Sequence, residues 1–338
     1  MVIPAIAELR ALAPSAAIDL VVGSWNREIA ATIPGIDRLE TLDAAWLTRG
    51  AGGRRLLGFI AEARRWRSRQ YDLAINFEPD IRSNLLLAAS GARRVAGFAS
   101  GGGGVLLDLA LDYDSRAHTS DNAIALVRAA LGTARAVTVS SMLSLPETAR
   151  AEAARLLQAL PPAARIGIHA GGGREIKQWP EARFAEVAAR MIADRHAVIV
   201  LTGAPGDRPQ VDLVKRQLPT ERVLDLCGRV DLVTLAAVLA EIDLLVTGDT
   251  GPMHLAHAVG TPVVAVFGPS DPARYAPRGT RDRLVRIDLP CSPCNRIRLP
   301  PTRCAGHTPD CLAGVDVAQV VHAIDNVLCE RDQRDRRS

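Results

Sequence analysis

The sequence has no uninterrupted apolar run of about 18 residues, the shortest length that suggests a membrane-spanning helix. Its N-terminus also lacks the basic, apolar and small-residue segments of a secretory signal peptide. We therefore expect a cytoplasmic protein, and any contact with the inner membrane to be peripheral, at the cytoplasmic face. A Gly-x-Gly-x-x-Gly turn after a strand, with an acid about 20 positions later, is missing as well, which counts against a dinucleotide oxidoreductase.

Lysine is nearly absent, because Lys177 and Lys215 are the only lysines among 41 basic residues. Where arginine is used almost everywhere, a retained lysine can mark a position that needs a compact ammonium group. The 37 acidic residues nearly balance the basic ones, and the net charge of +4 is too small to predict binding to nucleic acid. The charge is compatible with an acidic substrate.

Four of the six cysteines lie with His307 in one proline-rich segment. The first pair has the spacing of a zinc knuckle, so one interpretation is a structural zinc site formed by Cys291, Cys294, Cys304 and Cys311. The alternative is a reduced loop whose thiols pack as small apolar groups. Disulfide bonds fit a cytoplasmic protein less well.

Strand and helix patterns alternate in both halves of the 338-residue sequence, which predicts an α/β fold with two Rossmann-like domains built on parallel, doubly wound sheets. We expect domains at residues 1–155 and 156–329, a proline-flanked linker at 146–162, and a charged, disordered tail at 330–338. The strands of the second half are expected at residues 165–170, 197–201, 222–226, 244–246 and 262–267. The weaker strands of the first half are expected at residues 18–22, 37–41, 72–76 and 94–97.

The segment that begins at Leu244 is the most informative part of the sequence. Its apolar start predicts a buried strand, and Pro252 is typical of the first turn of a helix. Between them, Gly248 and Gly251 give the backbone the conformational freedom that a turn needs. The N–H groups and dipole of a helix N-terminus suit a phosphate. Asp249 would repel a phosphate, so we expect it to contact a sugar hydroxyl. The alternative is that Asp249 or Thr250 only caps the N-terminus of the helix.

Open parallel sheets bind ligands beyond the carboxyl ends of their strands, so the loops that follow the strands of the second half are expected to meet at one edge. These loops supply the glycine run 171–173, Lys177, Asp249 and His254, a set that suits a nucleoside diphosphate. Lys177 would neutralise the pyrophosphate and His254 would donate a hydrogen bond to it. A solvated loop lysine and a structural histidine are the alternatives, and His257 is expected to be a packing residue.

Several segments, in this order, resemble glycosyltransferase family 9, the heptosyltransferase family of lipopolysaccharide core assembly. They are His169-Ala-Gly-Gly-Gly-Arg-Glu-Ile-Lys177-Gln-Trp-Pro180, Thr202-Gly203, Gly248-Asp249-Thr-Gly-Pro-Met-His254-Leu-Ala256, Phe267-Gly-Pro-Ser-Asp-Pro272 and the Cys-Ser-Pro-Cys loop. The ordered set is specific, whereas an isolated Asp-Thr-Gly would be a weak signal.

The resemblance implies a GT-B architecture, with an acceptor-binding and a donor-binding domain that face each other across a cleft. It implies an inverting, metal-independent transfer that needs no cofactor, from a nucleotide sugar, typically ADP-heptose, to a lipid-linked or other cell-envelope glycan. Lys177 would lie near the phosphates of the donor and Asp249 near its sugar. The implied donor contacts are Gly171, Gly172, Lys177, Asp249, Thr250, Gly251 and His254.

Inversion needs a base for the acceptor hydroxyl and a stabiliser for the departing diphosphate. Lys177 and the helix that starts near Pro252 suit the second task. In the family the base is an aspartate in a Gly-Asp loop after the first strand, and this sequence begins in the helix that would follow that loop. We therefore expect the catalytic base upstream of Met1, in a longer natural protein. On the acceptor side we select Arg82 among several arginines that a solvated helix face would explain equally well.

Two further functions remain open. A family member that uses another nucleotide sugar for O-antigen, capsule or protein glycosylation would carry the same motifs. A catalytically silent protein that binds a nucleotide sugar would also carry them, and the absent Gly-Asp loop favours it.

Overall fold

The computed structural model describes residues 1–43, 56–137 and 142–335, and the chain forms two compact units, residues 1–144 and 145–338. The boundary precedes the predicted one at residue 155 because of helix α6 (Glu147–Leu157). The apolar face of α6 is buried, and the helix packs against α9 (Leu232–Ala240) of the second unit. The whole segment interpreted as a linker, residues 146–162, therefore belongs to the second unit.

The second unit contains a six-stranded parallel sheet with the strand order β11-β10-β9-β6-β7-β8. β7, β9 and β10 are buried along their whole length, which explains why their sequences are continuous apolar runs. The strands are β6 (Arg165–His169), β7 (Val198–Leu201), β8 (Val223–Asp225), β9 (Leu244–Gly248), β10 (Val263–Val266) and β11 (Arg283–Val285).

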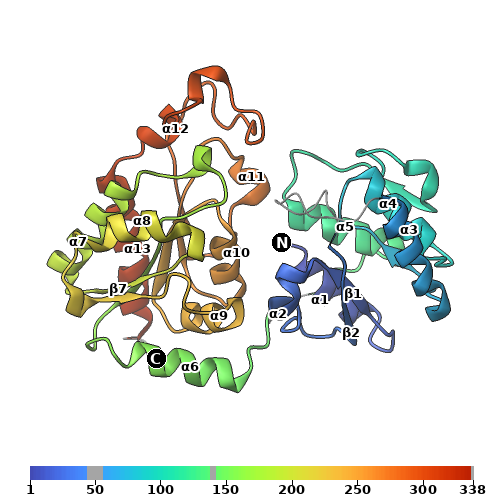
Figure 1. Ribbon diagram of the computed structural model, residues 1–338, viewed down its shortest axis with the longest axis horizontal. Coiled ribbons are helices and arrows are strands. Elements are labelled where there is room, and N and C mark those ends of the chain that lie inside the picture. The colour runs from blue at the N-terminus through green and yellow to red at the C-terminus, as the bar shows by residue number, and fades with distance from the viewer. Residues whose placement is uncertain (44–55, 138–141, 336–338) are drawn as a thin grey trace. The chain divides into compact units, whose positions relative to one another are not determined.

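Helices cover both faces of this sheet (Figure 1). α7 (Glu181–Arg195), α8 (Arg208–Lys215) and α13 (Val317–Asp335) form one layer, and α9 and α10 (Gly251–Ala258) form the other. Two short helices, α11 (Pro272–Tyr275) and α12 (Asp310–Ala313), follow β10 and the cysteine-containing loop. This arrangement confirms the predicted parallel, doubly wound sheet.

The chain reverses its direction of winding between β6 and β9, which are neighbours in the sheet. β6 is followed by α7 on one face, whereas β9 is followed by α10 on the opposite face. Loops that leave two adjacent strands toward opposite faces open a crevice between them, and ligands of doubly wound sheets bind there. The functional site is therefore expected at the carboxyl ends of β6 and β9.

The first unit has two smaller parallel sheets. One pairs β1 (Asp19–Val22) with β2 (Arg38–Thr41), and the other has the order β3 (Ala74–Ile75), β4 (Val95–Phe98) and β5 (Leu109–Leu111). The hydroxyl of Tyr71, just before β3, donates to a carboxylate oxygen of Asp19 at 2.5 Å, which ties the two sheets together. The four predicted strands of this half are present, whereas β5 is an addition.

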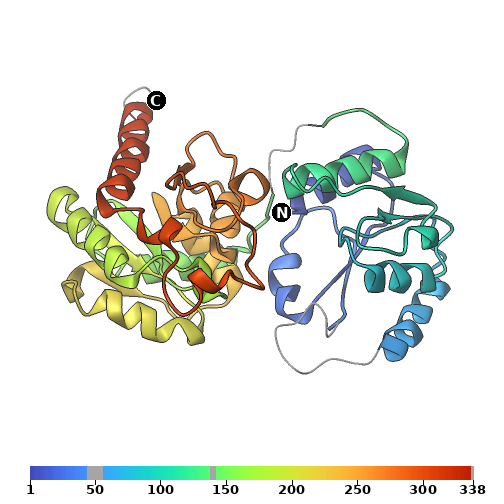
Figure 2. The same cartoon turned by 90° about the horizontal axis from the view of Figure 1, so that it is seen from above.

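Helices pack around these sheets, and α1 lies against α5 (Figure 2). The bounds are α1 (Ile3–Leu12), α2 (Arg27–Ala30), α3 (Leu56–Ala63), α4 (Ile81–Ala89) and α5 (Thr119–Leu131).

The C-terminal segment corrects another prediction, because α13 continues to Asp335. Glu330 pairs with Arg283, and Arg331 pairs with Asp243 at 2.5 Å, so both charges anchor the helix to the unit. The predicted disorder is therefore wrong for residues 330–335, and residues 336–338 lie outside the described residues. Among the helices of the described chain, none has the length and apolar character needed to cross a membrane.

Candidate functional site

Lys177 and Asp249 meet at the carboxyl ends of β6 and β9. Lys177 ends the short 3-10 helix in the loop after β6, and Asp249 directly follows β9. The sheet register pairs His169 with Thr247, which brings the two loops together. Lys177 Nζ lies 2.6 Å from Asp249 Oδ2, and the two side chains are only 23% and 12% exposed. Lys177 is therefore not a solvated loop lysine.

The N-terminus of α10 lies next to this ion pair. Thr250 occupies the N-cap position, but its hydroxyl lies 2.9 Å from that of Thr247 and does not cap the helix. Asp249 directs its carboxylate to Lys177 instead. The interpretation of either residue as a side-chain N-cap is therefore wrong. In the described structure, the N–H groups at the start of α10 have no side-chain cap, which suits an anionic ligand.

The glycine run after β6 is packed closely against the loop after β7. A Cβ atom on Gly171 would lie 2.3 Å from Cγ of Asp207, so no larger residue fits there without movement. Asp207 Oδ1 accepts a hydrogen bond from the N–H of Gly172 at 3.4 Å, and the side-chain amide of Gln178 donates to the Gly172 carbonyl at 2.6 Å. The sequence reasoning did not select Asp207, although it lies in a loop that was expected at this edge.

Three histidines of these segments have different settings, and His257 lies at the opposite edge of the sheet, where Asp282 also accepts from the N–H of Val263 at the start of β10. His169 is buried at the end of β6, with Nδ1 3.2 Å from the hydroxyl of Thr202. Burial lowers the pKa of His169, against an opposing effect of Asp207, so the imidazole is neutral near pH 7. His254 is a half-buried residue of α10. His257 is more than a packing residue, because its Nδ1 lies 3.0 Å from Asp282 Oδ2.

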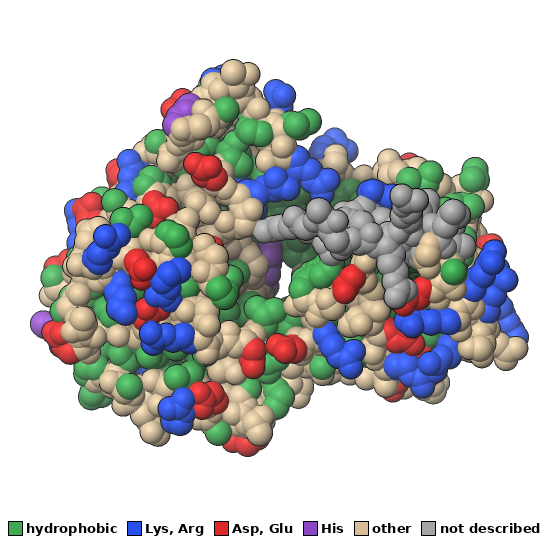
Figure 3. Space-filling model, in the orientation of Figure 1, with side chains coloured by type: hydrophobic (Ala, Val, Ile, Leu, Met, Phe, Trp, Pro, Cys, Tyr) green, Lys and Arg blue, Asp and Glu red, His purple; other side chains and the backbone are tan. Residues whose placement is uncertain are grey.

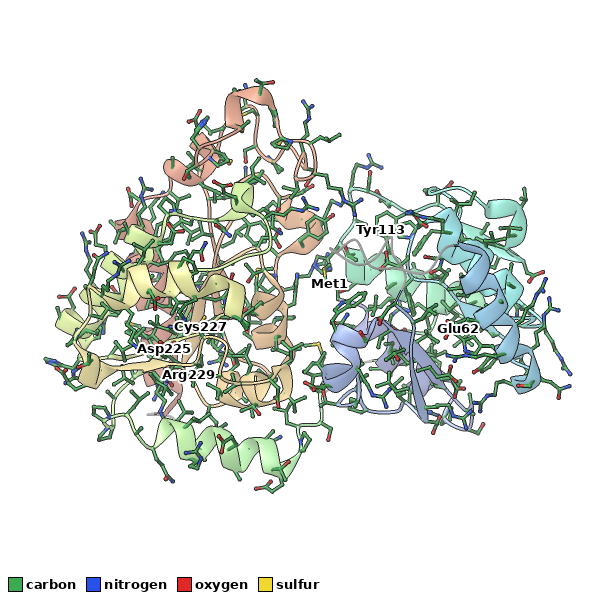
Figure 4. All side chains as sticks on the ribbon, viewed as in Figure 1. Met1, Glu62, Tyr113, Asp225, Cys227 and Arg229 are labelled. Carbon is green, nitrogen blue, oxygen red and sulfur yellow. The ribbon has the colours of Figure 1, made fainter. Side chains whose placement is uncertain are left out.

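The second lysine, Lys215, belongs to a structural ion cluster at the end of β8. The buried carboxylate of Asp225 accepts hydrogen bonds from Arg208 at 2.8 and 3.0 Å and from Lys215 at 3.1 Å. Burial alone would raise the pKa of Asp225, but these hydrogen bonds outweigh it and hold the pKa well below its usual range. Asp225, Cys227 and the exposed Arg229 lie close together in this region (Figure 4). Lys215 therefore balances a buried charge of the fold.

Arg82, the predicted acceptor contact, is a residue of α4 in the first unit. Its guanidinium forms a two-fold interaction with Asp80, at 3.0 Å from Nε and 2.7 Å from Nη2. Asp80 also caps α4 by accepting from the N–H of Arg82. Neighbouring arginines are paired as well, since Arg65 and Arg69 contact Glu40. Arg82 therefore has a local structural partner, and its role toward an acceptor stays a prediction.

The cysteine-containing loop does not form the predicted zinc site. Within the described residues, which include all four cysteines and His307, no group of three or more Cys, His, Asp or Glu side chains could hold a metal ion. The cysteines are free thiols, and burial raises the pKa of Cys311. The alternative interpretation, packing of the thiols as small apolar groups, describes Cys311, which is buried, whereas Cys291, Cys294 and Cys304 are half-buried.

Comparison with known proteins identifies the family. Residues 40–301 match the family model described as Glycosyltransferase family 9 (heptosyltransferase). The chain belongs to glycosyltransferase family 9. Lipopolysaccharide heptosyltransferase 2 of Escherichia coli is 26% identical over 290 residues, which cover 82% of each protein. Lipooligosaccharide heptosyltransferase 2 is 31% identical in Haemophilus influenzae and 29% in Campylobacter jejuni, and these alignments span 33% and 41% of those relatives.

Solved structures of this family share the fold. The E. coli ADP-heptose lps heptosyltransferase II superposes with a TM-score of 0.79 at 20% identity, covering 98% of this chain and 95% of that one. The family 9 glycosyltransferase of Veillonella parvula has a TM-score of 0.78 at 25% identity, covering 97% and 94%. E. coli heptosyltransferase WaaC with ADP-2-deoxy-2-fluoro heptose has a TM-score of 0.66 at 20% identity, covering 98% and 95%. The α/β, GT-B type fold predicted from the sequence is confirmed.

Proposed function

We propose that this family 9 protein is a glycosyltransferase that moves heptose from ADP-heptose onto a lipopolysaccharide-core or related cell-envelope acceptor. Family membership supports the class of reaction. The names of the E. coli relatives support heptose as the sugar and ADP as the carrier. The reaction would be inverting and metal-independent, at the cytoplasmic face of the inner membrane.

The observation that carries the proposal is the Lys177–Asp249 pair beside the N-terminus of α10. In the transfer, an acceptor oxygen forms a bond to C1 of the heptose as the bond from C1 to the diphosphate breaks. Lys177 and the N–H groups of Gly251 and Met253, on either side of Pro252, would stabilise the charge that develops on the departing ADP. Asp249 would accept hydrogen bonds from the sugar hydroxyls, and the backbone of Gly171 and Gly172 would contact the nucleotide. The space that a side chain on Gly171 would need is filled by Asp207.

The proton of the acceptor hydroxyl must go to a base during this step. The family resemblance implies an aspartate for this role. Arg82 in the first unit is proposed as a contact for an acidic group of the acceptor. Peripheral association with the inner membrane belongs to the same proposal.

Calorimetric titration with ADP, UDP and GDP, followed by transfer assays with the matching heptose or hexose donors, tests the proposal. We expect ADP to bind at least tenfold more tightly than UDP and GDP, and heptose to be the sugar transferred. Preference for UDP or GDP would support the alternative of another nucleotide sugar. ADP binding by a chain that includes the family's Gly-Asp loop, without any transfer, would identify a silent binding protein. Failure to bind any of the three would contradict all of these functions.

A further inference from the structure

A further cation, Arg274, follows β10 at the carboxyl edge of the sheet. Arg274 is a residue of α11, and the register pairs Val266, the last residue of β10, with Gly248, the last residue of β9. The loop that carries Arg274 therefore leaves the sheet beside the turn that carries Asp249. The guanidinium of Arg274 lies 5.0 Å from the centroid of the Tyr275 ring.

The hydrogen-bonding capacity of Arg274 is not used by the described part of the chain. Its Nε is buried and has no acceptor within hydrogen-bond distance. None of the ion pairs among the described residues involves its guanidinium. Arg274 as a whole is half-buried, but its Nε lacks the acceptor that a buried donor normally has, and leaving such a donor without a partner costs free energy.

The balance of charges at the carboxyl edge explains why a further cation such as Arg274 would be useful there. Lys177 is paired with Asp249 at 2.6 Å, so the pair as a whole carries no net charge. A nucleoside diphosphate brings at least two negative charges, and the partial charge at the start of α10 offsets only about half of one. A further cation is needed to bind the diphosphate tightly, and a guanidinium can donate two parallel hydrogen bonds to a phosphate.

The Cys-Ser-Pro-Cys-Asn segment holds the loop of Arg274 in place. The N–H of Asn295 donates to the Pro269 carbonyl at 2.8 Å, and its side-chain oxygen accepts from the N–H of Asp271 at 2.8 Å. The hydroxyl of Ser292 donates to the carbonyl of Gly268 at 2.8 Å. Asn295 has a φ of 55°, in the left-handed region that asparagine adopts more readily than most residues. Asp271 in turn caps α11.

We propose that Arg274 is a second cationic contact for the diphosphate of the nucleotide donor, and that Asn295 is the residue that positions its loop. This inference rests on the proposed function, because it assumes that a nucleoside diphosphate binds at this edge. In this proposal, the cysteine-containing segment supports the donor site through the hydrogen bonds of Ser292 and Asn295 to the loop of Arg274.

Titration calorimetry with ADP and with adenosine tests the proposal on the whole chain. We expect Arg274→Gln to weaken ADP about tenfold or more and to leave adenosine within twofold, because only the phosphates lose a contact. Arg274→Lys should retain part of the ADP affinity. Arg229→Gln is the matched control, since it removes one exposed positive charge near the end of β8, and it should change neither affinity by more than twofold.

Asn295→Ala should weaken ADP selectively, and Asn295→Asp should restore most of the affinity because it keeps both the acceptor oxygen and the left-handed backbone preference. If Arg274→Gln binds ADP within twofold of the unaltered chain, or weakens ADP and adenosine equally, the inference is wrong while the proposed function stands. If the unaltered chain binds neither ADP nor another nucleoside diphosphate, the proposed function itself fails.

Discussion

At the scale of single residues, Lys177 is the side chain whose removal should separate ligand binding from folding. Lys177→Gln removes the ammonium beside the predicted diphosphate and leaves Asp249 as an uncompensated negative charge. A charge-assisted hydrogen bond contributes about 1.5–3 kcal/mol, so we expect ADP affinity to fall about 10- to 100-fold. Titration calorimetry measures this change.

Lys215→Gln is the control, because Lys215 contacts the structural carboxylate of Asp225 on β8. β8 is the outermost strand of the sheet and is separated from β9 by β6 and β7. It should lower the thermal stability slightly and leave ADP affinity within twofold. Equal effects of the two substitutions on ADP affinity would mean that net charge, rather than the position of Lys177, controls binding.

His169 should make the stability of the protein depend on pH. Burial lowers the pKa of His169 below the ordinary value of about 6.5, so the unfolded chain takes up this proton at a higher pH than the folded protein. Neutral His169 therefore contributes to the free energy of unfolding above about pH 6.5. This contribution is lost as the pH falls below that value toward the lowered pKa of the folded state. Urea unfolding at pH 7.5 and pH 5.5 should therefore show a smaller loss of unfolding free energy for His169→Gln than for the unaltered chain. Identical losses would show that His169 is not a buried, neutral histidine.

The sequence identified some of these residues and missed others for a physical reason. Lys177 was noticeable because lysine is rare, and Asp249 because glycines flank it. Their direct contact spans 72 positions of sequence, and only the adjacent placement of β6 and β9 creates it. Asp207, Arg274 and Asn295 have no such local signature, since their roles come from loops that meet only in the folded sheet.

At the scale of elements, the tight contact between the loops after β6 and β7 should make Gly171 intolerant of a side chain. A Cβ atom there would lie 2.3 Å from Cγ of Asp207, so Gly171→Ala must displace the Asp207 side chain or one of the two loops. We expect ADP affinity to fall at least tenfold and the thermal midpoint to fall by a few degrees, about 1–2 kcal/mol of stability.

Gly206→Ala is the matched substitution in the neighbouring loop, because a Cβ atom on Gly206 would meet no atom within 4 Å. It should leave ADP affinity within twofold and the thermal midpoint unchanged or slightly higher. If Gly171→Ala behaves like Gly206→Ala, the loop after β6 does not approach the nucleotide.

The strands with continuous apolar runs were predicted well, whereas two short strands and the charged helical tail were not. The continuous apolar runs of β7, β9 and β10 identify buried parallel strands without further information. β5 and β11, which were not predicted, have three residues each and are strands because a neighbour pairs with them, although β3 and β8 are as short and were predicted. The helical tail was misjudged because its charges look like those of a disordered segment until their ion-pair partners are known.

At the scale of the whole molecule, the division after Ser144 makes a prediction about the second unit as an isolated fragment. A fragment of residues 145–335 should fold and keep the site residues, whereas a fragment that starts at residue 158 would expose the surface of α9 that α6 covers. Burial of Leu157 with Ala149 and Ala153 stabilises the unit by about 2–4 kcal/mol, so the shorter fragment should be less stable by that amount. Denaturant unfolding compares the two, and equal stability would place α6 outside the unit.

Charge is distributed over the molecule without a dominant basic surface on the face seen in Figure 3, where acidic and basic side chains are interspersed. This agrees with the small net charge and with a site that recognises its ligand through a few placed groups. Binding should accordingly depend on individual substitutions at the sheet edge and only weakly on total charge.

Hydrogen–deuterium exchange with and without ADP shows directly where the nucleotide binds. We expect ADP-dependent protection of the backbone amides at residues 171–178 and 249–254, the two loops that Lys177 and Asp249 join. Protection confined to the first unit, or binding of ADP without protection in either loop, would contradict it.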